Sequence, residues 1–324
     1  MKAALCKSLD GPGALEIEEI EKPEAAQGEV LIRVHVVALN HFDTLITRGK
    51  YQFKPQLPFS PGGEIAGVVA DVGAGVTGLR RGQRVMAYIG WGGAREFVAA
   101  PAEAVVPIPE GVSDEAAASI AITYGTAIHG LKDRGHLQAG ETVAVLGASG
   151  GAGLAAVEIA KLMGARVIAV ASSPEKLEVC RDHGADSLID YSGGDLKSAL
   201  RAATNGTGPD LVYDCVGGAF SEPAVRALNW QGRLLVIGFA AGAIPSLPLN
   251  LLLLKGAEAI GVFWGEAVKR DPQAHRANMQ DVLGWVASGA LQPRIHAVYP
   301  LDQIVEAIGV LDRREAVGKV VVEI

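Results

Sequence analysis

The chain has 324 residues, 49% of them hydrophobic and 20% charged, which indicates about two folded domains and excludes a disordered protein. Its 29 Lys and Arg against 36 Asp and Glu give a net charge of −7, without the dense basic clusters of a nucleic-acid-binding surface. No apolar run approaches the roughly 20 residues that span a bilayer, and Lys7 interrupts the first apolar segment too early for a signal peptide.

The cysteines indicate a reducing compartment. Cys6, Cys180 and Cys215 are widely separated, odd in number and never paired in a C-x-x-C motif. This pattern fits neither a disulfide framework nor a structural zinc site. We therefore expect a cytoplasmic protein with no membrane or nucleic-acid partner.

The first 120 residues predict a β domain. Short alternating segments occur at 15–20, 30–36, 65–72 and 84–88, with Gly and Pro between them. In the second of these, alternate residues are valine or isoleucine, a period of two that is typical of a half-buried strand. We expect an all-β domain, an irregular barrel.

From about residue 121 the pattern changes to apolar strands alternating with helical stretches. The expected strands are 142–146, 166–171, 187–190, 211–215, 233–237 and 259–263. The expected helices are 153–163, 174–183, 195–203, 221–229 and 249–255. The strands are continuous apolar runs, as in strands buried on both faces, so this part predicts a doubly wound parallel sheet.

The end of the chain is expected to rejoin the β domain. A polar helix at 273–287 is followed by HAVYPL and by a final GKVVVEI strand. Because a single strand needs a sheet to pair with, we expect residues 266–324 to complete the domain formed by 1–121. Residues 122–265 would then be an inserted domain.

A glycine-rich turn predicts dinucleotide binding. The apolar strand 142–146 leads directly into Gly147, Ala148, Ser149, Gly150, Gly151 and Gly153 and then into a helix. In such a turn one small residue permits the turn, a second lets the backbone approach a pyrophosphate, and a third permits close helix–strand packing. The start of the helix offers free N–H groups to the phosphates.

The tip of the next strand favours NADPH. NAD sites place an acidic residue there to bind the ribose 2′-hydroxyl. Here the strand ends in Ala171-Ser172-Ser173-Pro174-Glu175-Lys176, in which Ser172 and Lys176 could contact a 2′-phosphate. We expect Glu175, in the first turn of the following helix, to point to solvent.

The chain resembles the medium-chain dehydrogenase/reductase superfamily, and within it the zinc-independent, zeta-crystallin-like quinone oxidoreductases. The matching segments, in order, are ALNHFDTLITRGKY (38–51), PGGEIAGVV (61–69), YGTAIHGL (124–131), VLGASGGAG (145–153), VIGFAAG (236–242), GVFWG (261–265) and the closing GKVVV. The resemblance implies a Rossmann-type doubly wound sheet inserted into a GroES-like β-barrel catalytic domain.

The zinc ligands of the alcohol dehydrogenase branch are replaced in this chain. Where that branch has Cys-x-x-Asp and Gly-His-Glu, this chain has Asn40-His-Phe-Asp43 and Gly62-Gly63-Glu64. Because catalytic zinc needs about three protein ligands, we expect no metal. The expected chemistry is one that the coenzyme nearly performs alone: hydride transfer to a quinone or a conjugated enone.

The resemblance implies three catalytic residues in the acceptor cleft: Asn40, Asp43 and Tyr51. Asn40 could donate a hydrogen bond to a developing oxyanion, and Tyr51 could donate a hydrogen bond or a proton. Structural roles, such as helix capping by Asp43 and core packing by Tyr51, are the alternatives. Further coenzyme contacts implied by the resemblance are Thr126, Tyr191, Gly238, Phe239, Phe263, Trp264 and Arg314. Arg313 is the alternative to Arg314, and core packing is the alternative for Phe263 and Trp264.

Two other functions remain open. A 2-enoyl thioester reductase would use the same scaffold, and a non-catalytic role, as a crystallin-like NADPH-binding protein or an RNA binder, would keep the fold alone. The resemblance also implies a homodimer that joins the edge strands at 259–263, since an apolar edge strand is prone to aggregation when exposed.

Overall fold

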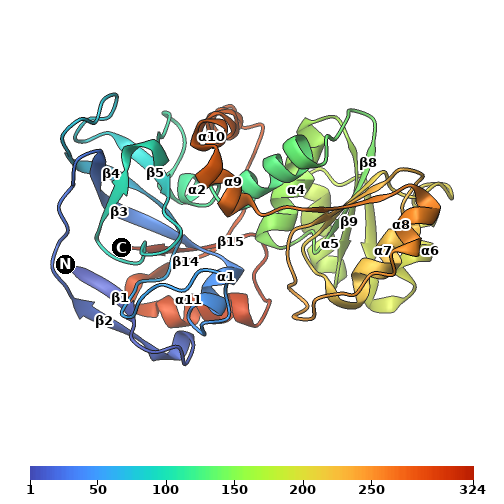
Figure 1. Ribbon diagram of the computed structural model, residues 1–324, viewed down its shortest axis with the longest axis horizontal. Helices are drawn as coiled ribbons and strands as arrows, with labels where there is room; N and C mark the ends of the chain where they lie inside the picture. Colours follow the sequence, from blue (N-terminus) through green and yellow to red (C-terminus); the bar gives the residue numbers. More distant parts are fainter. The chain divides into compact units, whose positions relative to one another are not determined.

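The computed structural model describes residues 1–324, which form two compact units (Figure 1). The first unit contains Met1–Ile122 and Ala267–Ile324, and the second contains Thr123–Glu266. The second unit is therefore inserted into the first along the chain. Both boundaries lie one residue beyond the expected positions.

The first unit is built on a seven-stranded sheet with the order β14-β15-β3-β4-β5-β7, and β6 pairs with β3. The strands are β3 (Glu29–Leu39), β4 (Glu64–Val72), β5 (Arg84–Tyr88), β6 (Phe97–Pro101), β7 (Val105–Pro107), β14 (Ile295–Pro300) and β15 (Lys319–Glu323). A separate antiparallel pair joins β1 (Lys2–Cys6) to β2 (Leu15–Glu19). The last strand of the chain pairs with β3 as expected.

Strand β3 is longer than the alternating pattern predicts. Val30, Ile32 and Val34 are buried, whereas Arg33 between them is exposed, as period two requires. Beyond Val36 the strand stays buried as far as Leu39. The reason is tertiary: helix α2 (Asp114–Ala118) packs against β3, with Asp114 2.7 Å from His35, so the face that alternation would leave open to solvent is covered here.

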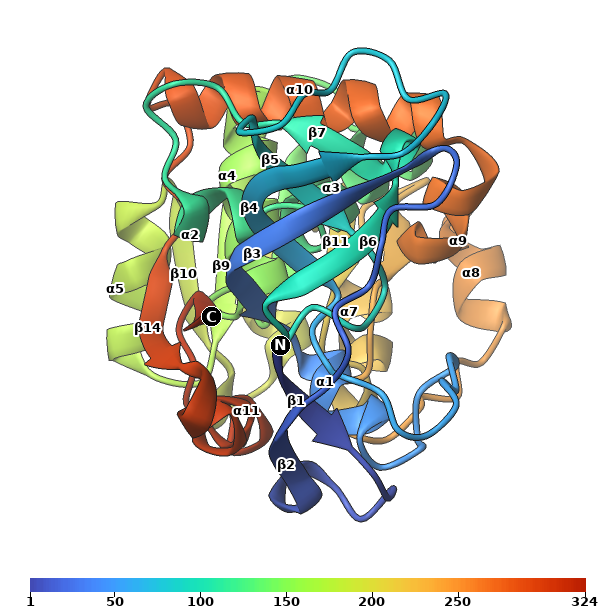
Figure 2. The ribbon, with the colours of Figure 1, turned by 90° about the vertical axis from the view of Figure 1, so that its left-hand side faces the viewer.

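The remaining elements of the first unit are short, except for one helix. They are η1 (Pro12–Ala14), α1 (His41–Ile46), η2 (Ala102–Ala104), α2 (Asp114–Ala118), α10 (Pro272–Ala287), η6 (Leu301–Gln303) and α11 (Ile304–Asp312). Helix α10 runs past β7, and α1 contacts α11 (Figure 2). Helix α1 begins immediately after β3, so the end of this central strand leads into the candidate site.

The second unit is a six-stranded parallel sheet with the order β10-β9-β8-β11-β12-β13. The strands are β8 (Thr142–Leu146), β9 (Arg166–Ala171), β10 (Ser187–Asp190), β11 (Leu211–Asp214), β12 (Arg233–Val236) and β13 (Glu258–Gly261). This confirms the predicted Rossmann-type, doubly wound sheet. The last strand is shorter than expected and lies at the sheet edge.

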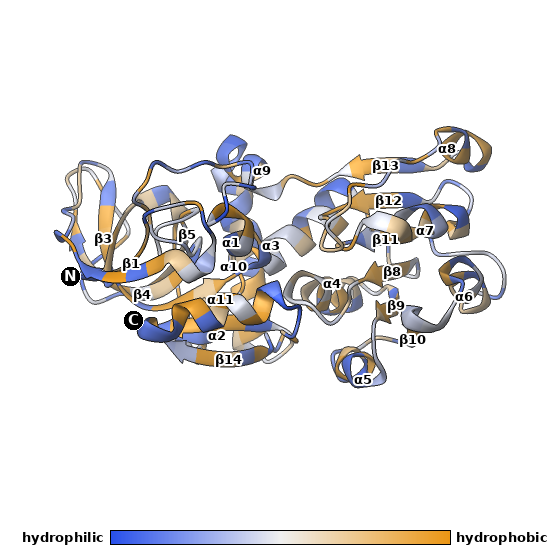
Figure 3. Ribbon diagram, turned by 90° about the horizontal axis from the view of Figure 1, so that it is seen from below, coloured by the Kyte–Doolittle hydropathy of each residue, from blue (hydrophilic) through white to orange (hydrophobic).

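The connections of this unit carry its helices and turns. They are α3 (Thr123–Ile128), the π-helical η3 (His129–Arg134), α4 (Gly151–Leu162), α5 (Pro174–Asp182), η4 (Tyr191–Gly193), α6 (Leu196–Ala202), η5 (Gly218–Phe220), α7 (Ser221–Ala227) and α8 (Asn250–Lys255); α9 (Trp264–Arg270) crosses the unit boundary. Figure 3 shows that β12, β13 and α8 are largely hydrophobic. No helix combines the length and apolarity required to cross a membrane.

Candidate active site

The glycine-rich turn connects the end of β8 to the start of α4, as predicted. Gly147 has a φ of 72°, which a residue with a side chain rarely adopts. The N–H groups of Gly147 and Ala148 both donate to the Val170 carbonyl of β9, which holds the turn against the neighbouring strand. Ala148 and Ser149 are both buried in the turn.

Two glycines of this turn have different steric surroundings. A β-carbon on Gly153 would lie 2.1 Å from the carbonyl oxygen of Gly147, so the close approach of helix and turn requires glycine there. A β-carbon on Gly150 would meet only that same oxygen, at 3.5 Å. The outer side of the turn is thus free of other protein atoms, and the first N–H groups of α4 have no intrahelical acceptor. These features fit a pyrophosphate.

The tip of β9 presents the predicted serine–lysine pair. The Lys176 ammonium lies 3.4 Å from the Ser172 hydroxyl, and both side chains are half-buried. Ser173 caps helix α5 by accepting from the Lys176 N–H. Glu175 is exposed, and its hydrogen bond with Ser173 lowers the pKa of its carboxyl.

Other predicted coenzyme residues lie around the carboxyl ends of the parallel strands. Tyr191 directly follows β10, and its ring packs 4.7 Å from that of Phe220. Gly238 and Phe239 follow β12, where the N–H of Gly238 donates to Asp214 of β11. These positions lie at the carboxyl ends of the parallel strands, where ligands of such folds bind.

The residues expected near the nicotinamide differ in exposure. Thr126 is half-buried on α3, and Phe263 is 49% exposed. Trp264 is only 7% exposed, and a β-carbon on Gly125 would lie 2.8 Å from its ring. Within this unit Trp264 packs on α3, which favours the alternative that it is a core residue, and its contact with the coenzyme stays a prediction.

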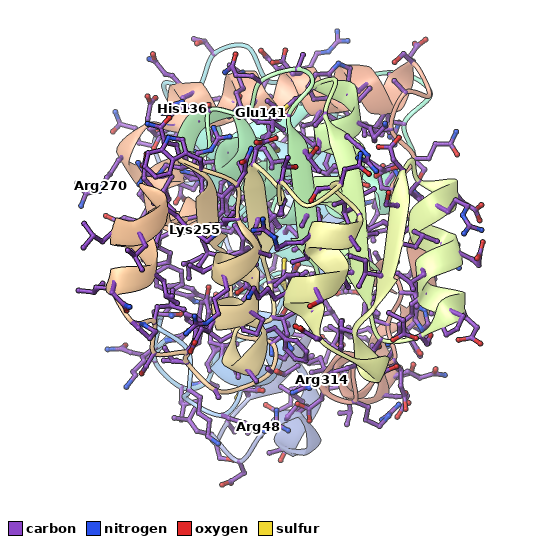
Figure 4. All side chains as sticks on the ribbon, turned by 90° about the vertical axis from the view of Figure 1, so that its right-hand side faces the viewer. Arg48, His136, Glu141, Lys255, Arg270 and Arg314 are labelled. Atoms are coloured by element: carbon purple, nitrogen blue, oxygen red, sulfur yellow. The ribbon has the colours of Figure 1, made fainter.

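Arg314, the last expected coenzyme contact, belongs to the first unit. It has a φ of 59° just after α11. Burial and the nearby Arg314 and Arg48 lower the pKa of His41, which starts α1. Figure 4 shows Arg48 and Arg314, and Arg48 forms a 2.7 Å ion pair with Asp312 of α11. Arg314 is thus one of a group of basic side chains at this end of the first unit.

A buried polar cluster surrounds Asn40 at the end of β3. The Lys319 ammonium lies 2.7 Å from Asn40 Oδ1 and 2.6 Å from Glu64 Oε1. Asn40 Nδ2 donates to the same Glu64 oxygen at 2.8 Å. Glu64 Oε2 accepts from the N–H of Ile122 at 2.7 Å. Each polar atom of the Glu64 and Asn40 side chains therefore has a partner.

Asp43 is fully buried and bound to the backbone. Its two carboxylate oxygens accept from the N–H groups of Asn40 and Gly62, each at 2.8 Å. Burial raises its pKa to about 6, against the opposing effect of these bonds and of Lys319. The expectation that Asp43 faces a substrate is corrected, since both oxygens hold the start of α1 and the loop at Gly62.

Tyr51 belongs to a row of aromatic rings in the first unit. Its ring lies 5.3 Å from Phe42 and 5.6 Å from Phe53, and Phe53 lies 6.1 Å from Trp91. The Tyr51 hydroxyl forms no hydrogen bond within the protein. Burial, and secondarily the charge of Asp43, raises its pKa, so it stays protonated and able to donate.

Several members of these two clusters were not identified from the sequence as site residues. Lys319 and Glu64 are each the first residue of a strand whose next three residues are uncharged and buried, and a charge in that position is a detectable signal. Lys269, whose ammonium lies 4.4 Å from the centre of the Phe53 ring, had no such signal. The chain contains no group of three or more His, Cys, Asp or Glu side chains placed to hold a metal ion.

A cavity of about 670 Å³ in the second unit lies at the amino ends of the parallel strands, whereas the glycine turn follows the carboxyl end of β8. Its lining includes Glu141, Arg233 and Glu258, which stand at the amino ends of their strands, and His136, labelled near Glu141 in Figure 4. Arg233 pairs with Glu141 there. Because coenzymes bind at the carboxyl ends of such strands, this cavity is separate from the candidate site.

Comparisons with known proteins agree with this arrangement. Residues 26–110 match the alcohol dehydrogenase GroES-like domain, and residues 151–288 match the family described as zinc-binding dehydrogenase. A quinone oxidoreductase-like protein 2 homolog of Nematostella vectensis is 39% identical, with 99% of this chain and 88% of that protein covered. Quinone oxidoreductase-like protein 2 of Bos taurus is 37% identical, over 100% of this chain and 92% of that protein.

Solved structures give the same result at the level of the fold. The structure of mycobacterial Rv1454c complexed with NADPH has a TM-score of 0.93 and 30% identity, and covers 100% of both chains. A quinone oxidoreductase of Pseudomonas syringae pv. tomato also has a TM-score of 0.93, with 28% identity and coverage of 100% of this chain and 99% of that chain.

Proposed function

Since the chain belongs to the medium-chain dehydrogenase/reductase family as a quinone oxidoreductase-like member, we propose that it reduces a quinone or a conjugated enone with NADPH. The observation that carries the proposal is the turn at Gly147–Gly153. There the Gly147 carbonyl occupies the β-carbon position of Gly153, while the outer side beside Gly150 is open for a pyrophosphate. A relative of the same fold is complexed with NADPH.

Selection of NADPH over NADH is assigned to the tip of β9. Ser172 and Lys176 offer a hydroxyl and an ammonium group where an NAD enzyme would place an acid. The turn backbone and the start of α4 would bind the pyrophosphate, and Tyr191, Gly238 and Phe239 would line the remainder of the site. When bound, NADPH supplies the hydride.

The acceptor is assigned to the first unit. The aromatic row of Phe42, Tyr51, Phe53 and Trp91 offers flat apolar surfaces that suit a planar conjugated ring. Asn40 would donate a hydrogen bond to the acceptor oxygen as negative charge develops on it. The unbonded Tyr51 hydroxyl would donate the proton that completes the reduction. Asp43 would act through the backbone by holding Asn40 in place.

We further propose that the reaction uses no metal. Asn40 and Gly63 occupy two positions of zinc ligands in the alcohol dehydrogenase branch. Of the carboxylates nearby, Glu64 is bound to Lys319 and Asp43 to backbone N–H groups. The ammonium group of Lys319 therefore supplies the positive charge in this cluster. Quinones and enones delocalise the arriving charge themselves, which suits chemistry without a Lewis acid.

Two properties of the whole protein complete the proposal. The exposed edge strand β13 would pair with that of a second copy, giving a homodimer. The three cysteines are all free, and Cys6 and Cys180 are buried, which suits the cytoplasm.

The test is oxidation of NADPH and NADH by the purified protein, with 1,4-benzoquinone and crotonyl-CoA as parallel acceptors. NADPH-selective turnover of the quinone is the expected result. Turnover of the thioester alone would instead assign the protein to the enoyl thioester reductases. NADPH binding without turnover of either acceptor would favour a non-catalytic role, and a preference for NADH would contradict the assignment of Ser172 and Lys176.

A further inference from the structure

The pairing of three strands brings Lys319, Asn40 and Glu64 together, although Lys319 and Asn40 are 279 residues apart in the sequence. Strand β15 pairs antiparallel with β3, with Val320 opposite Leu39, so Lys319 is placed opposite Asn40. On the other side of β3, Glu64 is opposite Ala38. The ion pair between Lys319 and Glu64 is almost completely removed from solvent, with 4% and 0% of the side chains exposed.

The chemistry of these neighbours fixes the orientation of the Asn40 amide. An ammonium group can only donate, so the Asn40 atom 2.7 Å from Lys319 must be the carbonyl oxygen Oδ1. An ionised carboxylate can only accept, so the Asn40 atom 2.8 Å from Glu64 must be the amide nitrogen Nδ2. Rotation of the amide by 180° would place two donors together on one side and two acceptors together on the other.

We propose that Lys319 and Glu64 are positioning residues that fix Asn40 as a hydrogen-bond donor to the acceptor. Nδ2 carries two hydrogens, of which Glu64 accepts one, and the other remains available for a ligand. This inference rests on the proposed function and narrows it, since the group beside Asn40 must be a carbonyl oxygen that gains negative charge. A substrate hydroxyl that must donate a hydrogen bond would find a donor in Asn40 Nδ2 rather than the acceptor it needs.

For catalysis, this means that Asn40 stabilises the acceptor oxygen more strongly after it has gained negative charge than before. A preorganised N–H donor strengthens its bond as charge accumulates on the oxygen, which accelerates the chemical step more than it strengthens binding. Loss of Lys319 removes the partner of Oδ1 and leaves the buried Glu64 charge uncompensated, so Glu64 moves and the amide is held less firmly. Loss of Lys319 together with Glu64 lets the amide rotate and present Oδ1 instead. The acceptor would then meet a lone pair, which repels the developing charge.

The test is a double-mutant cycle of Lys319→Met and Asn40→Ala with benzoquinone and NADPH. We expect Lys319→Met to lower kcat by about 10- to 100-fold, less than the roughly 10²- to 10³-fold for complete loss of an oxyanion donor, because Asn40 itself remains. KM and the NADPH dissociation constant should change less than about twofold. In the Asn40→Ala background the same substitution should change kcat less than about twofold, because Lys319 acts through Asn40. Effects that multiply in the double variant would overturn the inference.

Two further variants separate positioning from folding. Arg233→Met breaks the partly buried ion pair with Glu141 in the other unit, so it should lower the melting temperature without changing kcat. The double variant Lys319→Met with Glu64→Leu removes both charges of the buried pair and should fold, since apolar replacements of such pairs are often tolerated. It should show the same loss of kcat as Lys319→Met. Wild-type kcat in this folded variant would contradict the inference.

A measurement that needs no turnover distinguishes failure of this inference from failure of the proposed function. The two side-chain amide protons of Asn40 can be assigned in a spectrum of ¹⁵N-asparagine-labelled protein as the pair absent from Asn40→Ala. We expect one of them, bound to Glu64, to exchange slowly with solvent in the wild type and rapidly in Lys319→Met. Unchanged exchange in Lys319→Met would overturn the positioning role even if the protein reduces neither quinone nor thioester.

Discussion

The carbonyl oxygen of Gly147 fills the space that a side chain on Gly153 would need, since a β-carbon there would lie 2.1 Å from it. The two glycines therefore fix the distance between the end of β8 and the first turn of α4. The phosphate-binding surface depends on this distance.

Replacing Gly153 with alanine is expected to lower stability by about 1–3 kcal/mol, the usual effect of overpacking, because the helix must move away from the turn. The same movement should weaken NADPH binding about tenfold or more. Urea unfolding and coenzyme fluorescence titration would measure these effects. The matched control is Gly284→Ala in α10, where an added β-carbon meets no atom within 4 Å. It should leave NADPH binding unchanged.

Coenzyme choice is expected to depend on the tip of β9. Lys176→Ala should raise the KM for NADPH about tenfold and leave that for NADH unchanged, because the lost ammonium contact is with the 2′-phosphate alone. Ser172→Asp should reverse the preference in favour of NADH, because an acidic side chain there repels the 2′-phosphate and binds the ribose 2′-hydroxyl. Lys197→Ala, which removes an exposed lysine of α6, serves as the control. Equal changes for both coenzymes in Lys176→Ala would contradict the assignment.

Asp43 is expected to make stability depend on pH between about 4 and 6. Burial raises its pKa from 3.8 to about 6, so in this range the folded state holds a proton that the unfolded state has released. The contribution of Asp43 to the free energy of unfolding is therefore fully present below pH 4. As pH rises through 6 this contribution is lost, and the free energy of unfolding falls by on the order of 3 kcal/mol. Urea unfolding of wild type and Asp43→Asn at pH 4.5 and 7 measures the difference.

The sign of this pH effect distinguishes Asp43 from other carboxyls. Hydrogen bonds from Ser192 lower the pKa of Asp190, so its contribution to stability is lost as pH falls below its ordinary range. Asp190→Asn should therefore not reproduce the effect between pH 4 and 6. A constant stability difference between wild type and Asp43→Asn across this range would show that Asp43 does not cause it.

Tyr51→Phe tests the assigned proton donor. The substitution keeps the aromatic row intact and removes only the hydroxyl, so NADPH binding and the melting temperature should stay close to those of the wild type. If Tyr51 is the general acid, kcat with benzoquinone should fall about 10²-fold or more. Tyr299→Phe, in β14 of the same unit, should have no such effect. An unchanged kcat in Tyr51→Phe would assign protonation to solvent.

The proposed dimer is expected to depend on apolar side chains near β13. Ile244, Leu249, Leu253 and Leu254 are between 72% and 79% exposed, and β13 has an unpaired edge. Leu253→Lys with Leu254→Lys should convert a dimer to a monomer in light scattering after gel filtration. Leu162→Lys, at an exposed apolar position on α4, should remain dimeric. If light scattering shows that the wild-type protein is a monomer, the proposed dimer is contradicted.

Features that depend on local patterns could be predicted from the amino-acid sequence. The six parallel strands, the glycine turn and the Ser172–Lys176 pair all follow from short-range periodicity and spacing, because each forms within one β-α-β segment. The segment order also predicted that the final strand returns to the first unit. Boundaries shifted by a few residues where another element altered the burial pattern, as at the end of β3, which helix α2 covers.

Which candidate side chains are free to contact a ligand depends on the packing of the folded chain. Asn40, Glu64 and Lys319 come from three strands whose pairing no local pattern encodes, so their shared cluster was not predicted. Asp43 and Trp264 matched the expected motifs, yet backbone N–H groups occupy the former and Gly125 packs against the latter. A motif determines residue type and spacing, whereas the partners of a buried polar group depend on strands that are distant in the sequence.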